Sequence, residues 1–86
     1  MFKARKNYFV RTITNFYTGA TVRVGKDHVV LGKAAWIADT GRFADAMKTG
    51  TFDEVEPYPD GMAVTIPFSA IVDLCEWPHA LPREQK

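Results

Sequence analysis

The chain has 86 residues, of which 47% are hydrophobic and 24% charged, and its net charge at pH 7 is +1. This composition excludes intrinsic disorder, which goes with fewer apolar residues and a larger net charge. Its single cysteine, Cys75, excludes an intramolecular disulfide and a cysteine-rich zinc site. A chain of this length forms one domain, which we expect over residues 1–86 with frayed ends at about 1–6 and 82–86.

No apolar run of signal-peptide length follows the basic start of the sequence. No stretch approaches the roughly 20 apolar residues that a membrane-spanning helix needs. Small secreted domains are usually cross-linked by disulfides, so the single cysteine favours a reducing compartment. We therefore expect a cytoplasmic protein that does not bind a membrane.

The first third of the sequence predicts β-structure. Residues 7–17 are rich in β-branched and aromatic types and predict a strand. Thr18-Gly19 is a turn signal, and residues 20–24 alternate valine with polar types, which predicts a second strand paired with the first. After a turn at residues 25–27, residues 28–31 predict a short third strand.

The segment from Lys33 to Thr49 changes its hydrophobic period. Apolar residues recur at spacings of three and four, which predicts one face of a helix. The residues on this face are Trp36, Ile37, Phe43, Ala44 and Met47. Gly41 interrupts the run, so the segment forms either one helix with a weak point or two short helices that meet there. We expect Trp36, Phe43 and Met47 to lie in the core.

Gly50 is well placed to end this helix. Residues 51–56 carry two apolar side chains among three acids and predict an exposed strand at the edge of a sheet. Residues 57–61 contain two prolines and an Asp-Gly pair, which predict a rigid turn.

Residues 62–74 show the most regular alternation in the chain and predict a half-buried strand. Pro67 lacks an N–H group, so the strand lies at an edge there, bends or bulges. Residues 69–74 then form a separate strand or a short helical turn. In the tail, we expect Trp77 and Leu81 to pack against the body of the protein.

This order of elements predicts an α+β fold. We expect a small antiparallel sheet or an open SH3-like barrel, with one helix or two short helices packed on it.

Charge is distributed unevenly along the chain. Residues 1–48 carry nine Lys and Arg against three Asp, whereas residues 49–86 carry two against seven Asp and Glu. The two halves either neutralise each other across the sheet or give the protein one basic and one acidic surface.

Two charged clusters are candidate contact sites. The predicted edge strand and turn carry the acidic set Asp53, Glu54, Glu56 and Asp60. This set would dock a partner, or it would only keep a solvated edge from pairing with other strands. The N-terminal hairpin carries the basic set Lys3, Arg5, Lys6, Arg11 and Arg23. This second set would contact nucleic acid or an acidic partner.

Aromatic residues are interleaved with the basic set. Tyr8, Phe9, Phe16 and Tyr17 cannot all face inward on one strand, so we expect at least one to be exposed or to cover an edge. Core packing of the hairpin is the alternative explanation for most of them.

The sequence offers no convergent set of reactive groups. His28 and His79 lie far apart, and neither has a second ligand at metal-binding spacing. Cys75 ends an apolar strand, which favours a structural thiol over a nucleophile. We expect no catalytic residue, no metal site and no cofactor, and hence a protein that is not an enzyme.

One part of the sequence resembles a short module of small phage-encoded proteins. The stretches that carry the resemblance are Val10–Ile13, Gly19, Val22–Gly25, Val29–Leu31 and Ala35–Phe43. The module is a β-hairpin, a glycine turn, a strand and a helix, and it covers about residues 9–46. The resemblance implies an accessory factor of the virion or of host takeover, without a catalytic role.

We therefore expect a non-enzymatic protein–protein interaction module, encoded by a phage or mobile element, that binds and inhibits or modulates a host macromolecular complex. The compartment would then be the cytoplasm of the host cell. Two alternatives stay open: a structural or assembly protein of the virion, and a small nucleic-acid-binding regulator that uses the basic hairpin. The sequence leaves the oligomeric state open.

Overall fold

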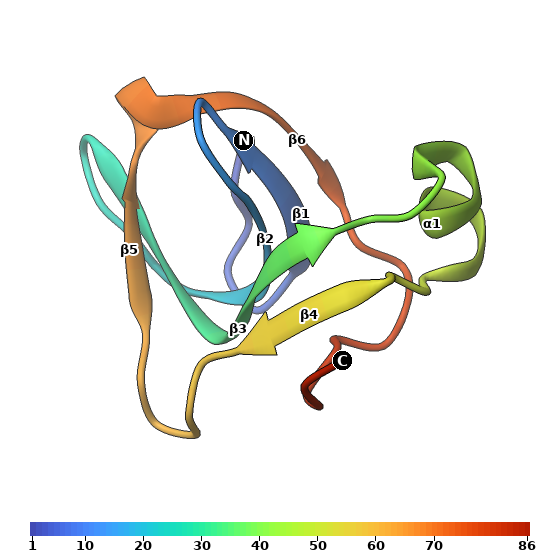
Figure 1. Ribbon diagram of the computed structural model, residues 1–86. Helices are drawn as coiled ribbons and strands as arrows, with labels where there is room; N and C mark the ends of the chain where they lie inside the picture. The colour runs from blue at the N-terminus through green and yellow to red at the C-terminus, as the bar shows by residue number, and fades with distance from the viewer.

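A computed structural model describes all 86 residues as a small, sheet-dominated α+β fold (Figure 1). It contains six antiparallel strands, one α-helix and one turn of 3-10 helix. In chain order these are β1 (Asn7–Thr12), β2 (Phe16–Val24), β3 (His28–Asp39), α1 (Phe43–Thr49), β4 (Glu54–Pro57), β5 (Val64–Pro67), η1 (Phe68–Ala70) and β6 (Ile71–Glu76). No helix is long and apolar enough to span a membrane.

Five strands form a ring that is joined by four strand pairings and closed by the chain itself, which links β5 to β6. β1, β2 and β3 form an antiparallel meander, and β5 pairs with the first part of β3, residues 28–31. β5 runs through η1 into β6, which pairs with β1. The second part of β3, residues 35–39, pairs instead with β4. In Figure 1, β1, β2, β3, β5 and β6 surround one interior, whereas β4 and α1 lie beside it.

A β-bulge near Lys33 lets β3 serve both partners. The register against β2 shifts at residues 18–20, and Lys33 has a left-handed φ of 47°. Before the bulge, Val29 and Leu31 face the interior of the ring, and after it Ala34 does. The inward-facing positions thus change from odd to even residue numbers.

The sheet buries apolar side chains on both faces. The inner core, inside the ring, consists of Phe2, Tyr8, Val10, Val29, Leu31, Ala34 and Ile66. The outer core, on the opposite face next to α1, consists of Phe9, Ala35, Ile37, Ala46, Phe52, Val55 and Trp77. The ring of Phe9 stacks on those of Phe52 and Trp77 at centroid distances of 6.0 and 5.8 Å. Strands buried on both faces appear in the sequence as near-continuous apolar runs.

The predicted helix over Lys33–Thr49 is wrong in its first half. Residues 33–39 belong to β3, and only Phe43–Thr49 forms α1. Burial on both faces, together with the bulge, produces the spacings of three and four that indicated a helix. The predicted end of the helix is confirmed, because Gly50 has a φ of 79° and its N–H donates to the carbonyl of Ala46.

The first predicted turn is also wrong. The chain turns at residues 13–15, and Gly19 lies inside β2. A Cβ atom at Gly19 would lie 2.9 Å from the Cβ of Leu31, so glycine is needed there for close approach between β2 and β3. Gly19 therefore reflects the close packing of β2 against β3 and not a turn.

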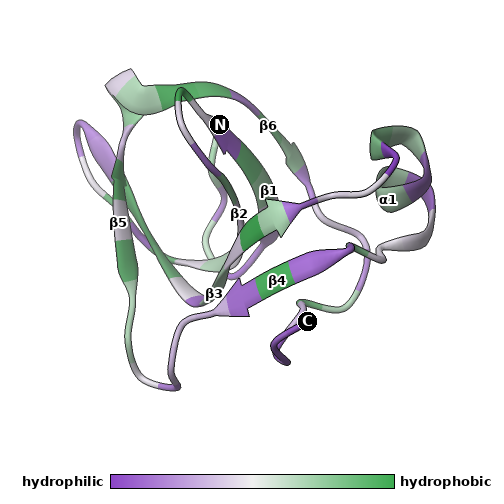
Figure 2. Ribbon diagram, viewed as in Figure 1, coloured by the Kyte–Doolittle hydropathy of each residue, from purple (hydrophilic) through white to green (hydrophobic).

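Several predictions for the second half are confirmed. β4 lies at an edge of the sheet, and Figure 2 shows it as an apolar band between two hydrophilic ones. The chain bends after Pro67, where η1 separates β5 from β6. Trp77 is buried and Leu81 packs against the outer core.

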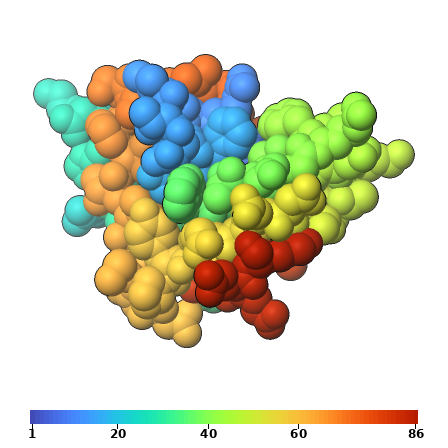
Figure 3. Space-filling view, in the orientation of Figure 1, coloured from blue at the N-terminus to red at the C-terminus, as the bar shows by residue number.

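Both ends of the chain contact the body of the protein. Phe2 is buried against Tyr8 and Phe68. At the other end, the C-terminal segment lies beside β4, as the red tail beside the yellow strand in Figure 3 shows. The backbone groups of Lys86 and Val55 exchange two hydrogen bonds of 3.0 Å. The ranges for which fraying was predicted thus make specific contacts.

Candidate binding site

Beyond Ala34, β3 extends past the ring, and its inner face is no longer enclosed there. β5 pairs only with residues 28–31 of β3, so it does not extend over the part of β3 that pairs with β4. Trp36 follows Ala34 by two residues and therefore lies on the same face. The residue is consequently 42% exposed instead of enclosed.

The predicted core positions of two aromatic residues are therefore wrong. Trp36 lies on a strand beyond the cover of β5, and Phe43 begins α1 with 46% of its surface exposed. Met47 does pack against the outer core.

Trp36 belongs to a row of side chains that crosses three strands. Tyr17 of β2 pairs with Trp36 of β3, and Trp36 pairs with Glu56 of β4. Directly paired residues of antiparallel strands project from the same face of a sheet. Tyr58 follows β4, and its N–H donates to the carbonyl of Ala34 at 2.9 Å. This hydrogen bond places a second tyrosine beside the row.

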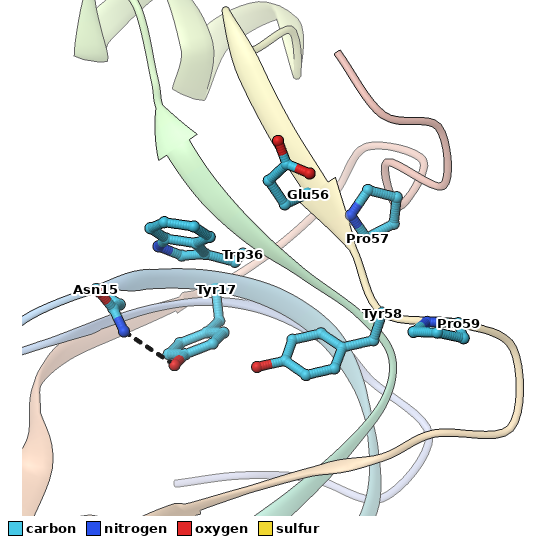
Figure 4. A pocket seen from close by; sticks show the side chains of 7 residues that line it. All are labelled: Asn15, Tyr17, Trp36, Glu56, Pro57, Tyr58 and Pro59. Atoms are coloured by element: carbon cyan, nitrogen blue, oxygen red, sulfur yellow. Dashed lines mark hydrogen bonds between the residues drawn. The ribbon is translucent and has the colours of Figure 1, made fainter.

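These residues line an open groove of about 480 Å³ (Figure 4). We call it the aromatic groove, and its lining residues are Asn15, Tyr17, Trp36, Glu56, Pro57, Tyr58 and Pro59. In Figure 4 the Tyr58 hydroxyl points toward Tyr17, the Tyr17 hydroxyl points toward Asn15, and Trp36 lies next to Tyr17. Both tyrosines also pack against the inner core, so the floor of the groove is continuous with the folded interior.

A second hollow of about 240 Å³ adjoins the aromatic groove and shares Asn15 and Trp36 with it. Its other lining residues are Thr14, Phe16, Ile37 and Ala38. The Trp36 side chain thus forms a ridge between two concave surfaces.

The polar groups of the aromatic groove are mainly donors. Asn15 Nδ2 donates to the hydroxyl oxygen of Tyr17 at 3.2 Å, which leaves the Tyr17 proton free to be donated. Burial, with a smaller contribution from Tyr17, raises the pKa of Tyr58 above its ordinary value, so this hydroxyl stays protonated at neutral pH. The indole N–H of Trp36 has no acceptor within the protein.

The acidic set contributes one member to the groove. Glu56 is half-buried and is its only charged lining residue. Glu54 is exposed on β4, and Asp60 accepts a hydrogen bond from Arg83. Asp53 lies against Gly41, close to the start of α1. The four acids are therefore spread over β4 and its flanking segments, and only Glu56 faces the aromatic side chains.

Two members of the basic set pair with acids of β6. Lys6 Nζ lies 4.0 Å from a carboxylate oxygen of Glu76. Arg11 binds Asp73 through two hydrogen bonds, one of them 2.8 Å long from Nε to Oδ1. The Arg11 guanidinium holds the pKa of Asp73 below its usual value. At these positions the basic and acidic halves of the chain neutralise each other.

The other three basic residues, Lys3, Arg5 and Arg23, are exposed and have no carboxylate within ion-pair distance. The N–H of Arg5 donates to the carbonyl of Thr21, which places the basic N-terminal segment beside the end of β2. None of these residues lines the aromatic groove.

The reactive side chains are engaged separately. His28 contacts its neighbour Asp27 at 2.8 Å, whereas His79 contacts the carbonyl of Met47 through Nε2 at 2.7 Å. Burial and the nearby Asp73 raise the pKa of Cys75, which disfavours its thiolate. No group of three or more His, Cys, Asp and Glu residues is arranged to hold a metal ion.

Comparison with protein-family models, curated protein sequences and solved structures finds no match for this chain.

Sequence reasoning did not identify the aromatic groove. It did indicate that one aromatic residue of the first hairpin would be exposed, and Tyr17 lines the groove. Tyr58 stands between two prolines in a turn, a setting that keeps a side chain out of the sheet. For Trp36 no local signal exists, because its exposure depends on where the distant strand β5 begins, at Val64 opposite Leu31.

Proposed function

We propose that this chain is a protein-binding module whose aromatic groove takes a segment of a partner protein. One observation carries the proposal: an exposed tryptophan, Trp36, is flanked by Tyr17 and Tyr58 in one concave surface. Tryptophan and tyrosine dominate the binding energy of protein interfaces, because they bring large apolar area with few rotatable bonds. Concave sites lined by aromatic side chains and a few polar groups are typical ligand sites.

The scaffold supports this proposal. The ring of β1, β2, β3, β5 and β6, with η1 between its last two strands, favours an open SH3-like barrel as the finer description of the fold. A groove whose floor packs on the inner core is held rigid, so little ordering entropy is lost when a ligand binds.

Charge favours a protein ligand over nucleic acid. The aromatic groove contains Glu56 and no lysine or arginine, so it would repel phosphate groups. Lys6 and Arg11 of the basic set are already paired with acids.

We propose a non-enzymatic accessory protein of a phage or mobile element that inhibits or modulates a host complex in the host cytoplasm. Co-purification with a host complex would support this role, whereas assembly into large particles would favour the virion alternative.

Selection from a displayed random-peptide library tests the proposed function. Peptides selected on the native chain should lose binding to Trp36→Ala and keep it to Phe43→Ala, which removes an exposed aromatic residue outside the groove. Amide shifts on adding a selected peptide should cluster at Tyr17, Trp36 and Tyr58. Peptides that bind Trp36→Ala as tightly as the native chain would contradict the proposal.

A further inference from the structure

We infer that the aromatic groove recognises an extended, proline-rich segment that carries a lysine or arginine. This inference rests on the proposed function and specifies its ligand. Three independent features of the groove support it: the state of the strand edges beneath it, the chemistry of its walls, and its single charge.

The strand edges exclude a ligand that binds as an added strand. The groove lies over β2 and β3, and both edges of each of these strands are already paired. The outer edge of β4 bonds to the backbone of Lys86 at Val55. A ligand in the groove therefore has no free backbone N–H and C=O groups of a strand edge with which to pair. A polyproline II segment needs none, because its backbone makes no internal hydrogen bonds and its carbonyl groups project outward.

The walls of the groove match the rings and carbonyl groups of such a segment. Tyr17, Trp36 and Tyr58 present aromatic surface, on which pyrrolidine rings pack, and proline-rich segments dock in grooves of this kind. The indole N–H and the tyrosine hydroxyls are donors that the outward carbonyl groups can accept from. Because the hollow beyond Trp36 adjoins the groove, an extended chain can continue across this ridge.

The single charge selects a basic residue. Glu56 is half-buried beside Trp36, and no cation of the protein lies within ion-pair distance of it. Asp60, by contrast, is already occupied by Arg83. A carboxylate at the side of an aromatic groove therefore attracts a lysine or arginine of the ligand, with a strength that falls as salt increases.

Three synthetic peptides of equal length test this inference. The first is proline-rich with one central lysine, the second replaces that lysine by glutamate, and the third replaces the prolines by alanine. Binding is followed by tryptophan fluorescence and by amide shifts of the native chain. We expect the first peptide to bind about tenfold more tightly than either of the others.

Variants assign the contacts. Trp36→Ala should weaken binding of the first peptide by at least about tenfold. Glu56→Gln should weaken it by roughly threefold and remove most of its salt dependence, as expected for a partly exposed ion pair. Glu54→Gln is the matched control, because Glu54 is on the same strand but outside the groove, and it should leave binding unchanged.

The outcomes separate this inference from the proposed function. If library-selected peptides depend on Trp36 but contain no proline, or if Glu56→Gln has no effect on the first peptide, the inference is overturned and the proposed function stands. If no peptide binds in a Trp36-dependent manner, both fall. Binding of a single-stranded oligothymidylate that shifts the amide signal of Trp36 would overturn both the inference and the proposed function, in favour of base stacking.

Discussion

At the scale of single residues, the two tryptophans occupy opposite environments. Trp77 is 4% exposed, stacks on Phe9 and Phe52, and donates through Nε1 to the carbonyl of Ala80 at 3.2 Å. Trp36 faces solvent across the aromatic groove. The same residue type thus stabilises the fold at one position and is available for binding at the other.

This contrast predicts different costs of truncation. Trp77→Ala should lower the free energy of unfolding by about 3–5 kcal/mol, since it empties a large site in the outer core. Trp36→Ala should lower it by less than about 1 kcal/mol. Urea denaturation followed by circular dichroism measures both. Equal losses would show that Trp36 is a core residue and would remove the main support for the groove.

A second residue-scale prediction concerns Asp73. Its pKa is lowered, mainly by the hydrogen bond from Arg11, so this carboxylate stabilises the fold above its unfolded pKa. That contribution is lost as pH falls through the lower, folded value. Arg11→Met should return the pKa of Asp73 to its ordinary range, as measured by carboxyl carbon NMR. Lys6→Met, on the same hairpin but paired with Glu76, should leave it unchanged.

At the scale of elements, β3 determines where the groove forms. Its bulge at Lys33 keeps Ala34 and Trp36 on the inner face, after Val29 and Leu31. Without the extra residue, Trp36 would turn to the outer face, because a one-residue shift in register reverses every side chain that follows. The bulge therefore links the closed ring to the open site.

The backbone at the bulge gives a third prediction. Lys33 is exposed, makes no side-chain hydrogen bond and has a φ of 47°, which glycine adopts without strain. Lys33→Gly should leave the free energy of unfolding unchanged or raise it by up to about 1 kcal/mol. Lys33→Val should lower it by about 1–2 kcal/mol, because a β-branched residue is strained there. Urea denaturation that gave the reverse order would contradict the left-handed bulge.

The same element shows what the sequence can and cannot predict. Alternation predicted β-structure at residues 62–74, and turn signals on either side predicted the short strand at residues 28–31. The missing N–H of Pro67 predicted an edge, a bend or a bulge there, and all of these signals are local. The bulge and burial on both faces of β3 have no local signal and imitate a helical period. The exposure of Trp36 depends on β5 beginning only at Val64, opposite Leu31, and this is a contact between distant segments.

At the scale of the whole molecule, the C-terminal tail fixes the groove to the ring. Arg83 donates hydrogen bonds of 3.0 Å to the carbonyl groups of Ala34 and Tyr58 and to Oδ1 of Asp60. It thereby joins β3 to the turn that carries one wall of the groove. The tail itself is anchored by Trp77 in the outer core and by Lys86 on β4.

Arg83 is therefore a positioning residue for the groove. Arg83→Met keeps the aliphatic stem but removes all three hydrogen bonds, so it should lower the free energy of unfolding by about 1–3 kcal/mol. Because the loss is local, the Tyr58 amide, which donates to Ala34, should exchange with solvent much faster. The amides of the inner core should exchange faster only to the extent that global stability falls. Affinity for a groove ligand should fall several-fold although Trp36 is intact.

Glu84→Gln, a change at an exposed residue next to Arg83, is the control. It should alter neither the exchange of the Tyr58 amide nor the affinity for a groove ligand. If Arg83→Met leaves exchange at Tyr58 unchanged, the tail does not position this wall, and the groove is held by β4 and the inner core alone.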